Sequence, residues 1–126
     1  MLPKFDYHEP ENMRSALEMM SSLKSNAKII AGGTDILVNM KKGVISPKYL
    51  VSLAKMKELF VLEQRKKGIA IGSHVIVSEL AESDLLWKKF SVIAKAASVL
   101  GSPLIRNRAT IGGNIVTARP AADLPP

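Results

Sequence analysis

Two short segments contain the residues most suited to bind a ligand, and each carries a pair of adjacent glycines. The first is residues 31–35 (Ala-Gly-Gly-Thr-Asp), directly after Ile29 and Ile30, and the second is residues 110–114 (Thr-Ile-Gly-Gly-Asn). Adjacent glycines let the main chain turn sharply and let a ligand approach it closely. Main-chain N–H groups beside a hydroxyl or an amide can form a nest for an anion. Two such segments in one chain predict a nucleotide diphosphate held between them.

The first segment sits between a predicted strand and a predicted helix. The unpaired N–H groups at the start of a helix favour an anion, and the Thr34 hydroxyl suits a phosphate oxygen. Asp35 is acidic, so we expect it to cap the helix rather than to contact phosphate. Neither the G-x-G-x-x-G fingerprint nor the Walker A sequence is present. A tight strand-to-helix turn without any ligand is the alternative interpretation.

The second segment is followed by Asp123, whose carboxylate suits hydrogen bonds from a sugar or from the adenine side of a nucleotide. The alternative is that Asp123 forms a surface turn beside Pro120 and Pro125. The two histidines, His8 and His74, are expected to be structural residues with satisfied hydrogen bonds.

Composition indicates a packed domain of modest size. The chain has 126 residues, 47% of them hydrophobic, and a mean hydropathy of +0.12. The absence of cysteine excludes a disulfide framework, a thiolate zinc site and a cysteine-ligated iron–sulfur cluster on this chain. No signal-peptide core and no apolar run of membrane-spanning length is present, so a cytoplasmic protein is expected.

The net charge of +7 has two interpretations. A basic excess is typical of proteins that bind nucleic acid or another polyanion. Alternatively, the cations occupy solvated helix faces, helix C-termini and hairpin turns, or meet an acidic partner subunit. No aromatic residue is interleaved with the basic groups, so no platform for stacking bases is visible and no nucleic-acid partner is expected.

Residues 1–55 alternate between strand and helix patterns. Residues 5–8, 27–31 and 49–53 predict strands, the last two as a parallel pair. A helix is expected to open at residues 9–12, with Met13, Leu17 and Met20 on its core-facing side. A second helix is expected from Thr34 or Asp35 to residue 42.

After residue 55 the pattern changes. Residues 59–63 and 69–71 predict an antiparallel hairpin with a loop at 64–68. Ser78 and Ser83 are candidate N-caps, and residues 87–100 predict one longer helix. Residues 104–126, including the second glycine pair, are expected to form loop with at most short elements. The chain stops shortly after Asp123 without a closing element, which predicts a fragment, a split gene product or a cleaved chain.

At these motifs the sequence resembles a known family. Residues 31–37 (AGGTDIL), 105–115 (IRNRATIGGNI) and 120–126 (PAADLPP) are similar to the FAD-binding subunit of molybdenum hydroxylases, which include carbon monoxide dehydrogenase and xanthine dehydrogenase. The resemblance implies an α+β fold, a truncated two-subdomain FAD-binding domain of the vanillyl-alcohol-oxidase type. Residues 1–55 would form the small α/β subdomain, and residues 56–126 would begin the antiparallel-sheet subdomain.

The resemblance also implies roles for individual residues, with the cofactor between the two subdomains. Residues 29–36 would wrap the FAD pyrophosphate, mostly through main-chain N–H groups, and Leu100 would lie against the flavin side. Asp123 would hydrogen-bond the cofactor. The implied cofactor-binding set is Ile29, Ile30, Ala31, Gly32, Gly33, Thr34, Asp35, Ile36, Leu100, Thr110, Gly113, Asn114 and Asp123, with no catalytic and no metal-binding residue.

Departures from the family pattern refine this expectation. Arg119 stands where the family commonly has Ser, and Thr34 is not a histidine, so FAD is expected to be non-covalent. Molybdopterin and a [2Fe-2S] cluster would lie on a large and a small partner subunit. FAD would relay electrons from the iron–sulfur clusters to NAD, oxygen or a quinone, a choice the sequence leaves open. Because the family subunit is more than twice as long, the chain is alternatively a structural half of a split flavin subunit that another chain completes.

Overall fold

The computed structural model describes residues 2–117, and the chain divides after Lys57 into two compact units. We call the part up to Lys57 unit 1 and the part from Glu58 onward unit 2, and each is described by itself. The elements of the chain, in order, are β1 (Asp6–His8), α1 (Met13–Leu23), η1 (Lys24–Asn26), β2 (Ala27–Ile30), α2 (Ile36–Lys41), β3 (Tyr49–Ser52), η2 (Lys57–Phe60), β4 (Leu62–Arg65), β5 (Gly68–Ile71), α3 (Val77–Glu82), α4 (Asp84–Lys89), α5 (Ser91–Val99), α6 (Pro103–Arg106) and α7 (Ile111–Thr117).

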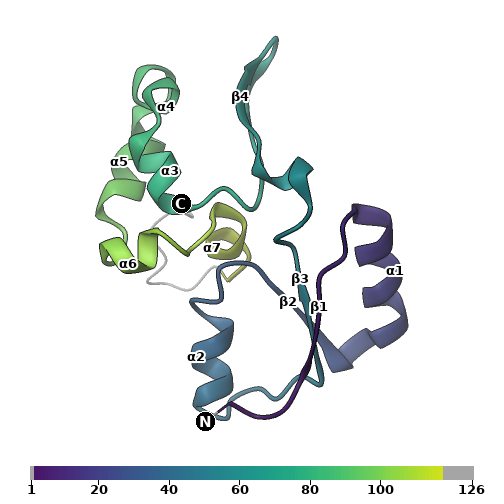
Figure 1. Cartoon of the computed structure of the whole chain (residues 1–126). Helices are drawn as coiled ribbons and strands as arrows, with labels where there is room; N and C mark the ends of the chain where they lie inside the picture. Colours follow the sequence, from purple (N-terminus) through teal and green to yellow (C-terminus); the bar gives the residue numbers. More distant parts are fainter. Residues whose placement is uncertain (1, 118–126) are drawn as a thin grey trace. The chain divides into compact units, whose positions relative to one another are not determined.

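Unit 1 is built on a three-stranded parallel sheet in the order β1-β3-β2. Strand β3, the last of the three in the sequence, lies in the centre, where Leu50 pairs with Tyr7 of β1 and with Lys28 of β2. Parallel neighbours need crossover connections, which α1 and α2 provide. Figure 1 shows these two helices on either side of the strands. The sequence prediction of three short strands, with 27–31 and 49–53 parallel, is confirmed.

The core of unit 1 is small and aliphatic. It contains the buried side chains of Ala16, Ala27, Met40, Leu50, Val51 and Met56. The predicted buried side of α1 is wrong in part, because Met13 is 42% exposed and Leu17 is 62% exposed, whereas Ala16 is buried. Asn12 is the N-cap of α1. Its side chain accepts a hydrogen bond from the Ser15 N–H at 2.9 Å and so fixes where the helix begins.

Unit 2 begins with an antiparallel hairpin formed by β4 and β5. Leu62 pairs with Ile71 at its base, and Arg65 pairs with Gly68 beside a two-residue turn. The predicted loop at 64–68 is therefore too long, and residues 59 and 60 belong to the 3₁₀ turn η2 instead of a strand. The end of the hairpin is exposed on both faces. Its polar strand residues therefore lack the alternating pattern that marks a half-buried strand.

The helices of unit 2 pack their apolar sides into one core. The predicted single helix over 87–100 is wrong, because the chain leaves the helical conformation at Phe90 (φ −143°, ψ 63°) between α4 and α5. This break lets both helices reach the same core. The buried cluster contains Val75, Val77, Leu80, Leu86, Ala94, Ala97, Leu100 and Ala109. Among residues 2–117, no helix has the length and apolar character needed to cross a membrane.

Serine side chains behave differently at the two predicted helix starts. The Ser83 hydroxyl accepts a hydrogen bond from the Leu86 N–H at 3.2 Å and caps α4, as the sequence predicted. Ser78 lies inside α3, whose N-cap is Ile76, so the prediction of Ser78 as a cap is wrong.

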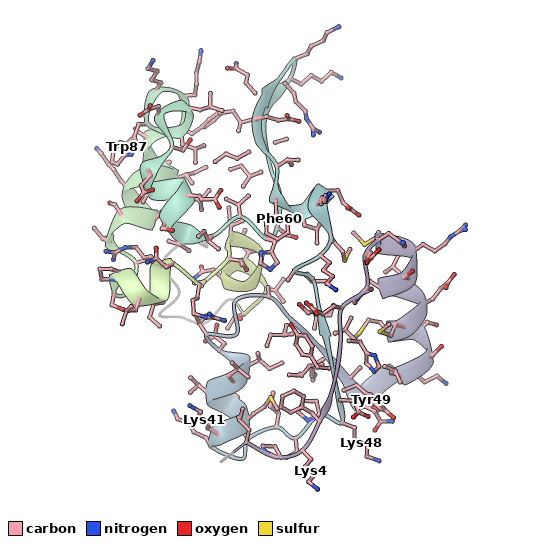
Figure 2. The ribbon with its side chains drawn as sticks, viewed as in Figure 1. Lys4, Lys41, Lys48, Tyr49, Phe60 and Trp87 are labelled. Atoms are coloured by element: carbon pink, nitrogen blue, oxygen red, sulfur yellow. The ribbon has the colours of Figure 1, made fainter. Side chains whose placement is uncertain are left out.

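Several basic side chains lie at element ends. Lys41 belongs to the last turn of α2, and Lys88 and Lys89 form the last turn of α4, where a cation is favoured by the helix dipole. Lys66 and Lys67 occupy the turn of the hairpin. Figure 2 shows the Lys4, Lys41 and Lys48 side chains extending outward from unit 1. These positions are those expected for solvated cations at helix C-termini and turns.

Replacing Leu86 with alanine should destabilise unit 2. Leu86 is completely buried in the unit 2 core, and deleting such a side chain leaves a cavity that costs about 2–5 kcal/mol. Leu104→Ala is the matched control, because Leu104 is 79% exposed and its truncation should change stability by less than about 0.5 kcal/mol. Urea unfolding followed by circular dichroism measures both. Equal effects of the two variants would contradict this core.

Candidate functional site

The first glycine segment connects β2 to α2 in unit 1. Strand β2 ends at Ile30. The Ile30 carbonyl accepts a hydrogen bond at 3.2 Å from the N–H of Leu53, the first residue after β3. The chain then turns through residues 31–35, which are all partly buried, into α2. Ile29 is 50% exposed, while Ile30 and Ile36 are partly buried. The segment therefore forms the strand-to-helix turn that the sequence predicted.

Gly33 makes this turn possible. Its φ of +78° is a conformation that residues with a Cβ adopt rarely, and the Leu37 Cδ1 atom lies 3.0 Å from where that Cβ would be. The Gly33 carbonyl accepts a hydrogen bond from the Leu37 N–H at 3.2 Å and so begins the helix. The glycine is explained by the geometry of the turn and by the packing of Leu37.

Asp35 occupies the N-cap position of α2, but its side chain forms no hydrogen bond that caps the helix. The prediction that the Asp35 carboxylate caps α2 is therefore wrong. Its φ of −101° and ψ of −48° are already near helical values, whereas a capping side chain usually requires an extended residue.

The second glycine segment is locked onto a neighbouring stretch of unit 2 by main-chain hydrogen bonds. The Ala109 carbonyl accepts from the Val77 N–H at 2.8 Å, and the Ile111 N–H donates to the Val75 carbonyl at 3.0 Å. The Gly112 N–H donates to the Ser73 carbonyl at 2.9 Å. We call this pairing of residues 73–77 with residues 109–112 the main-chain interlock.

The interlock explains the first glycine of this pair. A Cβ on Gly112 would lie 2.7 Å from the Ser73 carbonyl oxygen and 2.8 Å from the Ser73 Cβ. Both contacts are closer than real Cβ atoms tolerate, so only glycine lets α7 begin this near to residue 73. The absence of a side chain at Gly112 therefore allows the start of α7 to contact Ser73.

Thr110 caps the helix that starts at the interlock. Its Oγ1 atom accepts a hydrogen bond from the Gly113 N–H at 3.0 Å, and its carbonyl accepts from the Asn114 N–H at 3.0 Å. The N–H groups of residues 111–114 all have acceptors within the chain. The anion nest predicted from these glycines is therefore not formed by their N–H groups, and residues 111–117 form helix α7 where loop was predicted for much of the segment.

Leu100 lies at the junction between α5 and the next turn, in the same buried cluster as Ala109. Arg106 holds this junction, because its Nη1 atom donates to the carbonyls of Leu100 and Gly101, at 3.0 Å each. The guanidinium thus satisfies carbonyls at the end of α5 that have no partner within the helix.

The structure brings part of the predicted set together. Thr110, Gly113 and Asn114 share the first turn of α7, and Leu100 packs in the core against which Ile111 also lies. Residues 29–36 form one continuous segment of unit 1. Asp123 and Arg119 lie outside the described residues. Within residues 2–117, no group of three or more His, Asp and Glu side chains could hold a metal ion.

One unusual polar residue was not recognised from the sequence. His74 is 9% exposed, and neither imidazole nitrogen has a hydrogen-bond partner among the described residues. The expectation of a structural histidine with satisfied hydrogen bonds is therefore wrong. The surrounding sequence, Gly-Ser-His-Val, gives no signal of it, because an unsatisfied nitrogen depends on neighbours that are distant in the sequence.

The comparisons with known proteins identify the family. The model of the FAD binding domain in molybdopterin dehydrogenase matches residues 3–126, so the chain belongs to this family. It is 32% identical to the carbon monoxide dehydrogenase medium chain of Hydrogenophaga pseudoflava, over 98% of this chain and 43% of that relative. It is 30% identical to the xanthine dehydrogenase FAD-binding subunit of Escherichia coli, over 93% of this chain and 40% of the relative.

Solved structures agree with this assignment. The chain matches carbon monoxide dehydrogenase from Hydrogenophaga pseudoflava, in a form that lacks the Mo-pyranopterin moiety, with a TM-score of 0.95 and 31% identity over 98% of this chain and 43% of that one. It matches quinoline 2-oxidoreductase from Pseudomonas putida 86 with a TM-score of 0.87 and 25% identity, over 91% of this chain and 40% of that one. The truncated α+β FAD-binding fold expected from the sequence is thereby confirmed, and the chain spans less than half of these relatives.

Removing the Thr110 hydroxyl should weaken the start of α7. Thr110→Val keeps the shape of the side chain but leaves the Gly113 N–H without its acceptor, which should cost about 1 kcal/mol. The measurements are urea unfolding and hydrogen exchange of the Gly113 amide, which should become faster. Thr110→Ser retains the acceptor and should keep the Gly113 amide protected, so equal exchange in both variants would contradict the cap.

Proposed function

We propose that this chain is the FAD-contacting part of an oxidoreductase subunit in a molybdenum-containing hydroxylase or dehydrogenase. In that role FAD receives electrons from iron–sulfur clusters and passes them to an acceptor. The observation that carries the proposal is the family match over residues 3–126, which includes both glycine segments. When bound, FAD supplies the redox chemistry, while the protein binds and orients it. No residue of this chain is assigned as a catalytic acid or base.

In unit 1, residues 29–36 bind the cofactor pyrophosphate through main-chain N–H groups. The segment ends at the start of α2, where the helix dipole favours an anion. Thr34 adds a hydroxyl donor. The absence of histidine at position 34 supports non-covalent binding, because this segment then offers no imidazole for a bond to flavin.

In unit 2, Thr110, Gly113 and Asn114 contact FAD from the start of α7. The Thr110 oxygen accepts the Gly113 N–H and Thr110 is 2% exposed, so its hydroxyl proton would reach a phosphate oxygen only if the start of α7 opened toward the cofactor. The N–H groups of residues 111–114 are engaged within the chain. Leu100 supplies an apolar contact, and Asp123 accepts hydrogen bonds from the cofactor.

The partners proposed for the chain are a large subunit with the molybdenum cofactor and a small subunit with [2Fe-2S] clusters. The names of two relatives support this arrangement, because they are a medium chain and an FAD-binding subunit of larger dehydrogenases. The acceptor is NAD, oxygen or a quinone.

A second proposal is that the chain is half of a flavin subunit that a separate polypeptide completes. It is favoured by the span of the chain, which covers 43% of the carbon monoxide dehydrogenase medium chain of Hydrogenophaga pseudoflava. In this case the chain contributes one part of the FAD site and binds the cofactor only in the completed subunit.

The visible spectrum of the purified chain tests both proposals. Flavin absorbance that is released by acid indicates non-covalent FAD, bound by this chain alone. A colourless chain that takes up no added FAD, but acquires flavin when it is co-expressed with the completing polypeptide, indicates the split subunit. Absence of flavin in both preparations, with the fold intact by circular dichroism, would contradict the proposed function.

A further inference from the structure

The imidazole of His74 is the buried polar group that the packing of the described residues leaves unsatisfied. It is 9% exposed, and both Nδ1 and Nε2 are buried without a hydrogen-bond partner. A neutral imidazole carries one N–H donor and one acceptor nitrogen. Burying such groups without partners is unfavourable, so a native structure that retains them needs a reason.

The imidazole has a defined position in the structure. Its ring stacks on Phe60 with centroids 4.4 Å apart and an angle of 28° between the planes. The main-chain N–H of His74 donates a hydrogen bond to the Leu59 carbonyl at 2.8 Å. Figure 2 labels Phe60, near the base of the hairpin. The unsatisfied nitrogens therefore belong to the fold of unit 2 as the structure describes it.

His74 also lies within the main-chain interlock. Its two neighbours in the sequence, Ser73 and Val75, accept the N–H groups of Gly112 and Ile111. These two bonds fix the start of α7, where Thr110, Gly113 and Asn114 are proposed to contact FAD. The residues on both sides of His74 are therefore hydrogen-bonded to the segment of unit 2 that is proposed to bind the cofactor.

We propose that His74 is a further FAD-binding residue, whose imidazole N–H donates a hydrogen bond to an oxygen of the cofactor. This inference rests on the proposed function. FAD is rich in acceptor oxygens, which an N–H donor matches. The structure covers both nitrogens, so binding to FAD would require a neighbouring side chain to move. The side chain proposed to move is Phe60, which stacks on the imidazole, is 40% exposed and lies outside the buried cluster.

Two substitutions in the full chain separate cofactor binding from packing. His74→Leu removes both unsatisfied nitrogens, so the unfolding temperature of the FAD-free chain should stay the same or rise. The same variant should raise the dissociation constant for FAD by about tenfold, because a hydrogen bond to the cofactor is lost. His74→Gln retains a donor and should restore part of the affinity.

The readout is equilibrium binding of FAD, followed by flavin fluorescence. It uses the chain alone or, where that takes up no flavin, the chain together with the completing polypeptide. His8→Leu is the matched control, because His8 lies on β1 and its ring contacts Tyr49 at a centroid distance of 5.9 Å. It should leave the dissociation constant unchanged.

Opposite effects of His74→Leu on stability and on FAD affinity would support the proposal. A dissociation constant within about twofold of that of the original chain would overturn it. If the original chain binds no FAD in either form, the proposed function fails and this inference fails with it. Should the variants not fold, ¹⁵N NMR of the imidazole decides, because its signals should shift on FAD addition and unchanged signals would overturn the proposal.

Discussion

The main-chain interlock between residues 73–77 and residues 109–112 is the interaction on which the organisation of unit 2 depends. Its hydrogen bonds join two stretches that are far apart in the sequence. The helices between them, α3 to α6, contribute most of the buried cluster. The interlock requires glycine at position 112, because any side chain would overlap residue 73. It also fixes where α7 begins and, through Thr110, how that first turn is capped. The candidate binding residues of unit 2 therefore take their positions from contacts between two main-chain segments.

In unit 1 the corresponding constraint is the parallel sheet. Strand β3 pairs with both β1 and β2. Its pairing with β2 continues to Ile30, the residue directly ahead of the turn at residues 31–35. In open sheets of this kind, ligands bind beyond the carboxyl ends of the strands. The first glycine segment leaves β2 at that end. Gly33 then allows the turn into α2 within a few residues, which keeps the main chain of the segment close to the strand end.

Much of the fold could be predicted where a local pattern decides the outcome. The largely apolar stretches at 27–31 and 49–53 predict the parallel strands, although the expected burial holds for β3 and not for β2, where Lys28 and Ile29 are exposed. The break between α4 and α5 at Phe90 could not be predicted, because it depends on how two helices share one core. The prediction of which side of α1 is buried was wrong in part for a similar reason, since the small Ala16 is buried while Leu17 is exposed. The unsatisfied nitrogens of His74 depend on contacts that no sequence pattern carries.

The two glycine pairs show that the residues of a family motif can have a role in the fold that the sequence alone does not reveal. From the sequence, both glycine pairs were interpreted as places where a ligand approaches main-chain N–H groups. In the structure, Gly33 serves a turn with positive φ, whereas Gly112 lets one protein segment contact another. The N–H groups of residues 111–114 are engaged within the chain, and Thr110 is only 2% exposed, so the polar groups of this segment are used by the fold of unit 2. The glycines of the second segment therefore position the start of α7, because Gly112 lets it lie against residue 73 and the Gly113 N–H completes the Thr110 cap.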